Sequence, residues 1–389
     1  MRMGPGLRRD DAVDGALRTA SRCHRVIAVT QIIPKEGPST MTTISTSGLD
    51  LAKSVFQFHG NDAGGQAVKK RQLRRAEVLP FLAKLPPHLV AMEACGTAHH
   101  WAREIAKLGH TVKLLPPNQV KPYVRRGKTD AADAEAICEA ATRPVIREVP
   151  VKTISQQSLL TSHRCRDLLV RQRTQTMNAI RSLVAEFGSI AAQGHEGLKA
   201  LRAIIKTPND PRLPEAARLA LAEAAAVLAA IQTGIDKIDA QIKAELKTCD
   251  TSERLATIPG VGPLLATAMA ATVGDATVFK SGRSFSAWLG LTPRLNGTGG
   301  KVTLGPITKK GDSYLRRLLV MGAIAMLGRA RRYPEKHPKL TALLARTASF
   351  KTAAVALANK MARTIWALMV RGGDYVAEHR PVMPAARGA

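Results

Sequence analysis

Residues 88–117 read "HLVAMEACGTAHHWAREIAKLGHTVKLLPP", and this stretch decides the fold class of the first part of the chain. Its opening apolar run, 88–94, predicts a buried strand. Residues 98–109 follow as a helix closed by a glycine, and residues 110–117 predict another strand, stopped by two prolines. Strand-like and helix-like segments alternate to about residue 150, so the sequence predicts an α/β domain there. Further strands are expected at residues 44–51, 54–60 and 67–73.

The composition is strongly basic. The chain has 389 residues, with 58 Lys and Arg against 30 Asp and Glu, for a formal net charge of +28. Because the basic residues are spread over most of the chain, we expect an extended nucleic-acid partner and no membrane-targeting patch. No run of 18 apolar residues stands out, so no membrane-spanning helix is expected. The five cysteines are scattered without a CxxC spacing, which favours a reducing cytoplasm and argues against disulfides or a zinc site.

Changes in composition divide the chain into four parts. Residues 1–40 are basic and rich in Gly, Pro and Arg, without the apolar core of a signal peptide. They are either a disordered extension or the product of a start codon assigned too far upstream, with Met41 as the alternative start. We expect residues 41–150 to form the α/β domain, residues 151–250 a helical arm, and residues 251–389 a mostly helical C-terminal domain.

The predicted arm consists of two long helices separated by a break at "KTPNDPRLP", residues 206–214. The first covers residues 155–187 and is studded with arginines. The second covers residues 214–247, where apolar residues recur at spacings of 3, 4, 3 and 4, the pattern of a coiled-coil seam. The seam residues are Leu228, Ile231, Ile235, Ile238 and Ile242. We expect this arm to support self-association, as a dimer or a tetramer.

Four acidic residues of the first domain are candidates for one metal site. Asp50 lies at the end or in the middle of the first predicted strand, in "GLDLAK", and Glu93 ends a later strand in "AMEACGT". Asp130 and Asp133 begin a helix in "GKTDAADAEAI", with Thr129 or Asp130 as its N-cap. Residues three apart share a helix face, so the two carboxylates repel unless a cation neutralises them. Converging carboxylates suit Mg²⁺ or Mn²⁺, and two such ions support phosphoryl transfer. The alternative is that Asp130 is only a cap and Asp133 only a first-turn acid favoured by the helix dipole.

Other motifs point to phosphate contacts. "TIPGVGPLLATAM", residues 257–269, has the form of a helix-hairpin-helix, in which Gly260 and Gly262 allow a DNA backbone to approach closely. The alternative is a plain tight turn between packed helices. Clusters of cations favour nucleic-acid binding without base specificity, although such runs are usually solvated faces. On the arm they are Arg164, Arg166, Arg171, Arg173 and Arg181; in the C-terminal domain they are Lys301, Lys309, Lys310, Arg316 and Arg317; and on the last helix they are Lys351, Lys360 and Arg363.

Several of these motifs occur together and in order: "GLDLAK", "AMEACGTAHHWAREI", "GKTDAADAEAI", "IPGVGPLLA" and "GLTPR…GGK…LGPITKKGDSYLRRLL". In this the chain resembles DEDD-type insertion-sequence transposases, the IS110 family with its IS1111 subgroup, which are related to the Piv DNA invertases. The resemblance covers roughly residues 41–375. It implies a RuvC-like first domain with a ribonuclease-H-type sheet, in which Asp50, Glu93, Asp130 and Asp133 bind the metal.

The resemblance also implies a serine nucleophile in the C-terminal domain, which forms a covalent link to DNA. Its place falls in the glycine-flanked loop "LNGTGGKV", residues 295–302, where this chain has Thr298. A threonine hydroxyl can act as a nucleophile when a base or metal activates it, but its methyl group hinders in-line attack. We take Thr298 as the candidate nucleophile, with Thr303 and Ser313 as the nearest alternatives. The other interpretations are that the protein is inactive, or that Thr298 is a plain turn residue in a glycine-rich loop.

The function expected from these features is that of a DNA transposase or site-specific recombinase. The family resemblance further implies a bridge RNA that pairs with donor and target DNA. One alternative is a RuvC-like junction-resolving nuclease that attacks with water and needs no Thr298. Another is a non-catalytic nucleic-acid-binding remnant of a decayed element.

Overall fold

The computed structural model describes residues 43–124 and 129–376. The chain divides into two units, Met1–Thr42 and Thr43–Ala389, and the described residues belong to the second. The predicted extension at residues 1–40 and the alternative start at Met41 lie outside the described residues.

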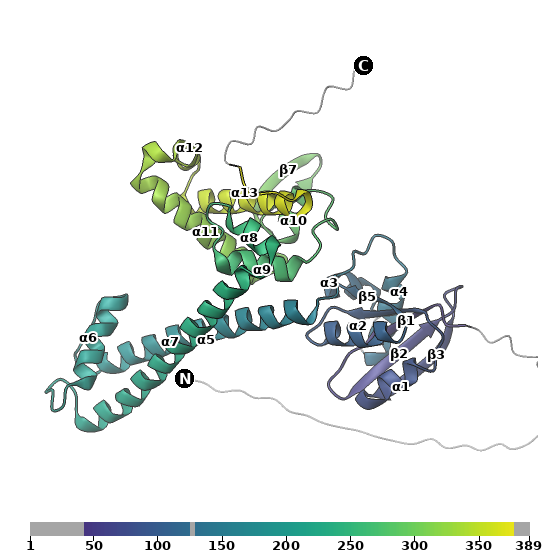
Figure 1. Ribbon diagram of the computed structural model, residues 1–389, viewed down its shortest axis with the longest axis horizontal. Coiled ribbons are helices and arrows are strands. Elements are labelled where there is room, and N and C mark those ends of the chain that lie inside the picture. The colour runs from purple at the N-terminus through teal and green to yellow at the C-terminus, as the bar shows by residue number, and fades with distance from the viewer. Residues whose placement is uncertain (1–42, 125–128, 377–389) are drawn as a thin grey trace, which may run out of the picture. The chain divides into compact units, whose positions relative to one another are not determined.

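The first domain is a five-stranded mixed sheet with helices, as predicted (Figure 1). Strand order is β3-β2-β1-β4-β5; β1, β4 and β5 are parallel, whereas β2 pairs antiparallel with both β1 and β3. The strands are β1 (Thr46–Asp50), β2 (Val55–Asn61), β3 (Ala67–Arg74), β4 (Leu89–Glu93) and β5 (Thr111–Leu115). The helices are η1 (Arg75–Glu77), α1 (Val78–Leu82), α2 (Ala98–Lys107), α3 (Pro117–Val120), η2 (Lys121–Tyr123) and α4 (Asp130–Ala141).

The core of this domain follows from the alternation along β2. Phe56 and Phe58 are two residues apart, so they point to the same face of the sheet, and both are fully buried. Phe56 meets Trp101 of α2 edge to face, with ring centroids 5.0 Å apart, the geometry that aromatic pairs prefer. A separate apolar cluster, which includes Ala136 and Ile137, holds α4 against the sheet.

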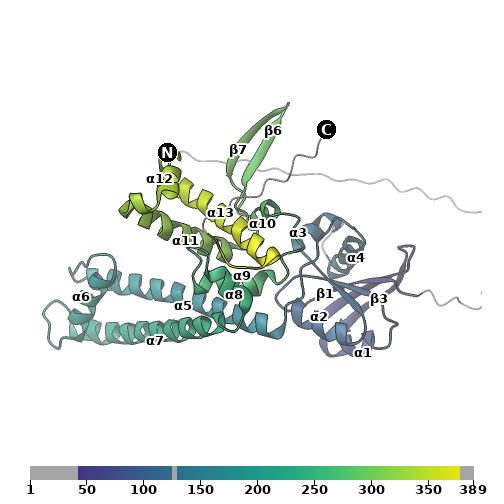
Figure 2. The ribbon, with the colours of Figure 1, turned by 45° about the horizontal axis from the view of Figure 1, so that its top comes forward.

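The arm is a hairpin of two 32-residue helices, α5 (Ile154–Ala185) and α7 (Glu215–Leu246), with α6 (His195–Lys206) between them in sequence (Figure 2). A capping box starts α5: Thr153 accepts from the Gln156 backbone N–H, and the Gln156 side chain accepts from Thr153. The two long helices pack along each other. Buried residues recur every seven positions on α7, at Leu221, Leu228, Ile235 and Ile242.

The seam packs within the single chain, and self-association of the arm stays a prediction. The heptad spacing is confirmed, but Leu221 and Leu228 share a core with Ile180 and Val184 of α5 in the same chain. Ile235 is 2% exposed within the single chain. The seam therefore holds the hairpin together and is not available to a second copy.

The C-terminal domain is helical apart from one antiparallel hairpin of two strands. Its core is formed mainly by α9, α11 and α13. The elements are α8 (Asp250–Ala256), α9 (Pro263–Val273), α10 (Gly282–Trp288), β6 (Pro293–Thr298), β7 (Lys301–Ile307), α11 (Ser313–Arg332), η3 (Pro334–Lys336), α12 (Pro338–Ala345) and α13 (Phe350–Arg371).

A buried histidine connects the arm to this domain. His163 of α5 is 1% exposed, and its two ring nitrogens lie 3.0 Å from the Tyr314 hydroxyl and 3.0 Å from Thr267 Oγ1. Because Thr267 donates its hydroxyl proton to Pro263 O, it must accept from His163 Nε2–H, which leaves Nδ1 to accept from Tyr314. Burial lowers the pKa of His163 to about 4, so the ring is neutral near pH 7.

Two helices, α7 and α13, are long and apolar enough to cross a membrane by length and composition alone. No such helix was expected from the sequence. Both have partners within the protein: α13 supplies Ala358, Ala362 and Ile365 to the C-terminal core, and α7 packs along α5. Core helices of soluble proteins meet the same criteria, so the finding is weak evidence for a membrane.

Candidate metal centre and nucleic-acid interface

Gly48 allows the helix that carries two of the acids to lie directly on the strand that carries the third. A Cβ at Gly48 would stand 2.1 Å from Ala134 O and 2.6 Å from Cys138 N, both backbone atoms of α4. Only glycine permits so close a contact between helix and strand. Cys138 packs in the same contact, with its sulfur 3.5 Å from Thr46 O, and burial raises the pKa of its thiol to about 12.

This contact brings three of the predicted acids together at one edge of the sheet. Asp50 is the last residue of β1, whereas Asp130 and Asp133 lie in the first turn of α4. Their carboxylate oxygens lie within 4.8 Å of one another. Thr129 is the N-cap, as one of the two predicted options had it, and accepts from the Ala132 N–H at 3.2 Å. The helix start thereby fixes both aspartates.

Glu93, the fourth predicted acid, ends β4, the parallel neighbour of β1. The β1–β4 register pairs Gly48 with Ala91, so both strands end on the same side of the sheet. Glu93 is nevertheless outside the group of three whose oxygens lie within 4.8 Å. The structure therefore brings together three of the four acids and places the fourth at the same edge.

The donor set of this centre fits a divalent cation. All three groups offer carboxylate oxygens, the ligands that hard cations such as Mg²⁺ and Mn²⁺ prefer. Asp130 is exposed and Asp50 and Asp133 are half-exposed, which leaves room for water and a substrate phosphate. Without a cation, three carboxylates this close repel one another. The triad Asp50, Asp130 and Asp133 is thus consistent with divalent metal.

The candidate nucleophile lies at the tip of the β6–β7 hairpin. Thr298 pairs with Lys301, and the two residues between them, Gly299 and Gly300, have φ of +56° and +79°. A two-residue turn with positive φ at both positions is the favoured connection of a tight hairpin. The structure thus turns the predicted glycine-flanked loop into a tight hairpin, for which the "TGGK" pattern is a sequence signal.

The two faces of the hairpin differ in polarity. Leu295, Val302 and Leu304 form an apolar face and are 66–71% exposed. Thr298 lies on the other face with its partner Lys301. Of the alternatives, Thr303 donates its hydroxyl to Asn296 O at 3.2 Å, and Ser313 is the first residue of α11.

The predicted helix-hairpin-helix has the expected helices, α8 and α9, joined by residues 257–262. Its two glycines differ. Gly260 has φ +83° and packs against α11, where an added Cβ would meet Met326 at 2.9 Å and Gly322 O at 3.1 Å. Gly262 is exposed, and nothing lies within 4 Å of its would-be Cβ. The packing favours a structural role for Gly260, whereas Gly262 is open to a ligand.

Many of the predicted nucleic-acid-binding cations already have partners inside the protein. Arg166 pairs with Asp239 and Arg317 pairs with Asp167, so these two help to hold α5 against its neighbours. The other engaged arginines are Arg171 (with Asp167), Arg173 (with Gln232), Arg181 (with Gly194 O) and Arg316 (with Leu289 O). Among the described residues no side-chain partner is seen for Arg164, Lys301, Lys309 or Lys310. Phosphate contacts by any member of the set stay a prediction.

Comparison with known proteins gives two family matches. Residues 252–338 match the model of the Transposase IS116/IS110/IS902 family, and residues 47–188 match a DEDD-type transposase model of the IS110 group. The second match runs from the α/β domain through α5.

Full-length relatives show the same similarity. A "Probable family 20 transposase" of Pseudomonas aeruginosa is 46% identical over 85% of this chain and 98% of its own length. The transposase for insertion sequence element IS1328 of Yersinia enterocolitica is 37% identical, with the same two coverages. The transposase for insertion sequence element IS1111A of Coxiella burnetii is 37% identical over 91% of this chain and 96% of its own length.

Proposed function

Because the chain belongs to the IS110 family of DEDD-type insertion-sequence transposases, we propose that it cuts and rejoins the DNA ends of its element through a covalent hydroxyl–phosphate intermediate. The observation that carries the metal-dependent half of this proposal is the convergence of Asp50, Asp130 and Asp133 within 4.8 Å. The covalent half rests on the family resemblance and on the position of Thr298.

Asp50, Asp130 and Asp133 hold Mg²⁺ or Mn²⁺ in this proposal, and Glu93 completes the set from the adjacent strand. When bound, the cation supplies positive charge that offsets the charge developing on the phosphate oxygens. The three aspartates fix where the scissile phosphate sits, because α4 is locked against β1 at Gly48. Exposure of Asp130 is compatible with access by a DNA backbone.

The Thr298 hydroxyl is the proposed nucleophile. Its oxygen forms a bond to phosphorus while the bond from phosphorus to one sugar oxygen breaks, and the hydroxyl proton ends on that leaving oxygen. Attack by a sugar hydroxyl of a second strand reverses the step and rejoins the DNA. The support is positional: Thr298 is exposed, and the glycines beside it leave the tip free of bulky side chains. Thr303 is less suited, since its proton is donated to Asn296 O.

DNA is the partner expected of a transposase, and a bridge RNA and self-association are the further partners that we propose. The net charge of +28 supports an extended nucleic-acid footprint. Apolar residues on the outer surface of the arm support assembly; Leu183 is 52%, Val227 54% and Leu219 63% exposed. We place the protein in the cytoplasm, where its DNA substrate lies.

The experiment that tests the proposal uses the element with its flanking DNA in a bacterial host. Outward-facing primers detect the excised circular junction by PCR, for wild type, Asp130→Asn, Thr298→Ala and Thr298→Ser. We expect junctions from wild type and Thr298→Ser only. Junctions from Thr298→Ala would place the nucleophile elsewhere and favour attack by water, and junctions from Asp130→Asn would remove the metal centre from the mechanism.

A further inference from the structure

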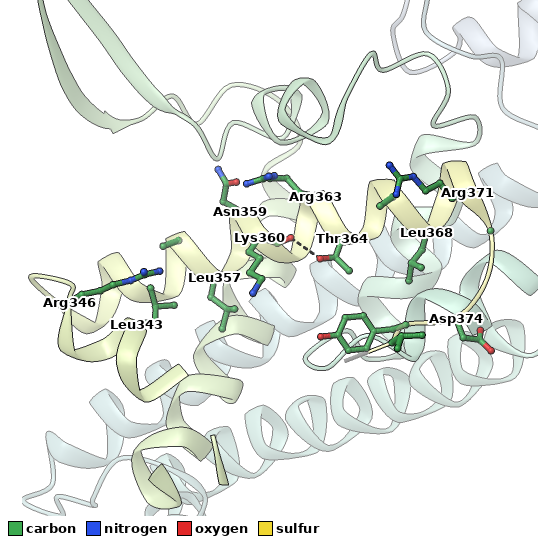
Figure 3. Close-up of a pocket in the computed structure, with 15 residues that line it drawn as sticks. Leu343, Arg346, Leu357, Asn359, Lys360, Arg363, Thr364, Leu368, Arg371 and Asp374 are labelled. Carbon is green, nitrogen blue, oxygen red and sulfur yellow. Dashed lines mark hydrogen bonds between the residues drawn. The ribbon is translucent and has the colours of Figure 1, made fainter. Parts of the chain in front are cut away.

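A groove runs along α13 in the C-terminal domain, away from both the acidic residues and the hairpin tip in sequence (Figure 3). It is bounded by the end of α12 and by the short segment that follows α13, and its volume is about 780 Å³. We call it the α13 groove. Its polar and aromatic lining includes Arg346, Asn359, Lys360, Arg363, Arg371 and Tyr375. The matched C-terminal family segment ends at residue 338, before any of them.

Four cations line the α13 groove and only one acid, Asp374, does so. Arg346, Lys360, Arg363 and Arg371 are all exposed, and none of them forms an ion pair with a residue that the structure describes. This sets them apart from the arginines of the arm, several of which pair with aspartates. Concentrated cations that lack internal partners create a positive potential that attracts an anion.

The spacing of side chains on α13 shapes the groove. Ala356, Lys360, Thr364, Ala367 and Arg371 are separated by four, four, three and four residues, so they share one helix face. Ala367 lies between Lys360 and Arg371 and, because it is small, leaves the space between these two cations open. From Lys360 to Arg371 the helix rises by roughly 16 Å, which matches about five stacked nucleotides of one strand.

The opposite wall offers an aromatic ring. Tyr375 is half-buried in the groove wall, and its backbone N–H donates to Thr257 Oγ1 at 3.1 Å, which fixes its position. Bases of unpaired strands stack on such rings while nearby cations follow the phosphates. A space of about 780 Å³ is the size of a small-ligand pocket and cannot enclose a paired duplex.

We propose that the α13 groove binds an unpaired DNA strand, with phosphates at Lys360, Arg363 and Arg371 and a base against Tyr375. DNA is the nucleic acid on which the family acts. The proposal does not rest on the covalent chemistry of Thr298 or on the metal centre, so a binding assay tests it separately from cleavage.

The test measures binding of fluorescein-labelled dT12 by anisotropy, with the full chain, at several salt concentrations. The groove variant is Lys360→Glu with Arg363→Glu. The matched control is Lys336→Glu with Lys339→Glu, exposed lysines of η3 and α12 that are also three residues apart and do not line the groove. We expect the groove variant to bind dT12 at least tenfold more weakly. The slope of its log binding constant against log salt concentration should be shallower by at least about 1.4, because two phosphate contacts are lost. The control should bind within threefold of wild type. Equal losses in both variants would overturn the proposal, since they would indicate only a general charge effect.

The ring and the type of strand are tested with the same probe. Tyr375→Ala should weaken dT12 binding about fivefold or more, whereas Tyr375→Phe should bind as wild type does, because stacking needs the ring and not the hydroxyl. Unchanged dT12 binding by Tyr375→Ala would show that no base stacks on Tyr375. If a 12-base-pair duplex or a U12 RNA bound more tightly than dT12 and lost as much in the groove variant, the assignment to unpaired DNA would be wrong.

Discussion

Replacement of Gly48 by alanine tests how the acidic centre is built. The new methyl carbon would lie 2.1 Å from Ala134 O, whereas ordinary contact begins at 3.4 Å. A retreat of α4 by about 1.3 Å is therefore needed, and no side-chain rotation can relieve a clash with backbone. Overpacking of this kind destabilises by roughly 1–3 kcal/mol.

The same retreat moves Asp130 and Asp133 away from Asp50. A misplacement of about 1 Å at a catalytic site costs on the order of 100-fold in rate. We therefore expect Gly48→Ala to reduce the excised-junction yield, measured by quantitative PCR, about 100-fold while most of the protein stays folded. Circular dichroism and urea unfolding of the purified variant separate lost activity from lost structure.

Gly64→Ala is the matched control. Gly64 lies in the turn between β2 and β3, and its would-be Cβ meets only Asp62 Oδ1, at an ordinary 3.4 Å. This variant should keep wild-type junction yield. If Gly48→Ala also kept the wild-type yield and unfolding free energy, the strand–helix contact would not be what positions the aspartates.

Three further predictions concern stability. Thr129→Ala should lower the unfolding free energy by about 1 kcal/mol and reduce junction yield, because α4 loses its N-cap; urea unfolding and quantitative PCR check both. Ile235→Asp should melt the arm hairpin and lower the unfolding free energy by about 3 kcal/mol or more, since it buries a charge at a 2% exposed position; a change in light-scattering mass with unchanged unfolding would contradict this. The pKa of His163 is about 4 in the fold and about 6.5 in the unfolded chain. As the pH falls from 6.5 to 4, the unfolded chain binds a proton that the folded chain does not bind. The unfolding free energy therefore decreases over this range, by up to about 3 kcal/mol. His163→Gln should lack this part of the pH dependence in urea melts at pH 7.0 and 4.5.

The sequence predicted the elements of the first domain well, because local signals mark their ends. The apolar run before Glu93 became β4, and the prolines after Leu115 ended β5. Thr129 was one of two expected caps, and its hydroxyl accepts the expected N–H. Asp50 and Glu93 could be assigned to one edge of the sheet from the strand ends alone.

What the sequence could not provide depends on contacts between distant segments. Heptad spacing shows that Ile235 faces a helix, but not that this helix is α5 of the same chain. Counting cations could not reveal that Arg317 pairs with Asp167, 150 residues away. The role of Gly48 was missed, although a glycine inside a strand signals close backbone approach.

The closed seam of the arm has a consequence for how the protein can change over evolution. Each long helix has 32 residues and so extends about 48 Å. Because the seam repeats every seven residues, inserting one heptad into both helices lengthens the arm by about 10 Å and preserves the seam, whereas inserting two residues rotates the helix beyond them by roughly 200° and turns the seam outward. The geometry of the arm therefore permits a change of length only in fixed steps, independently of the acidic centre.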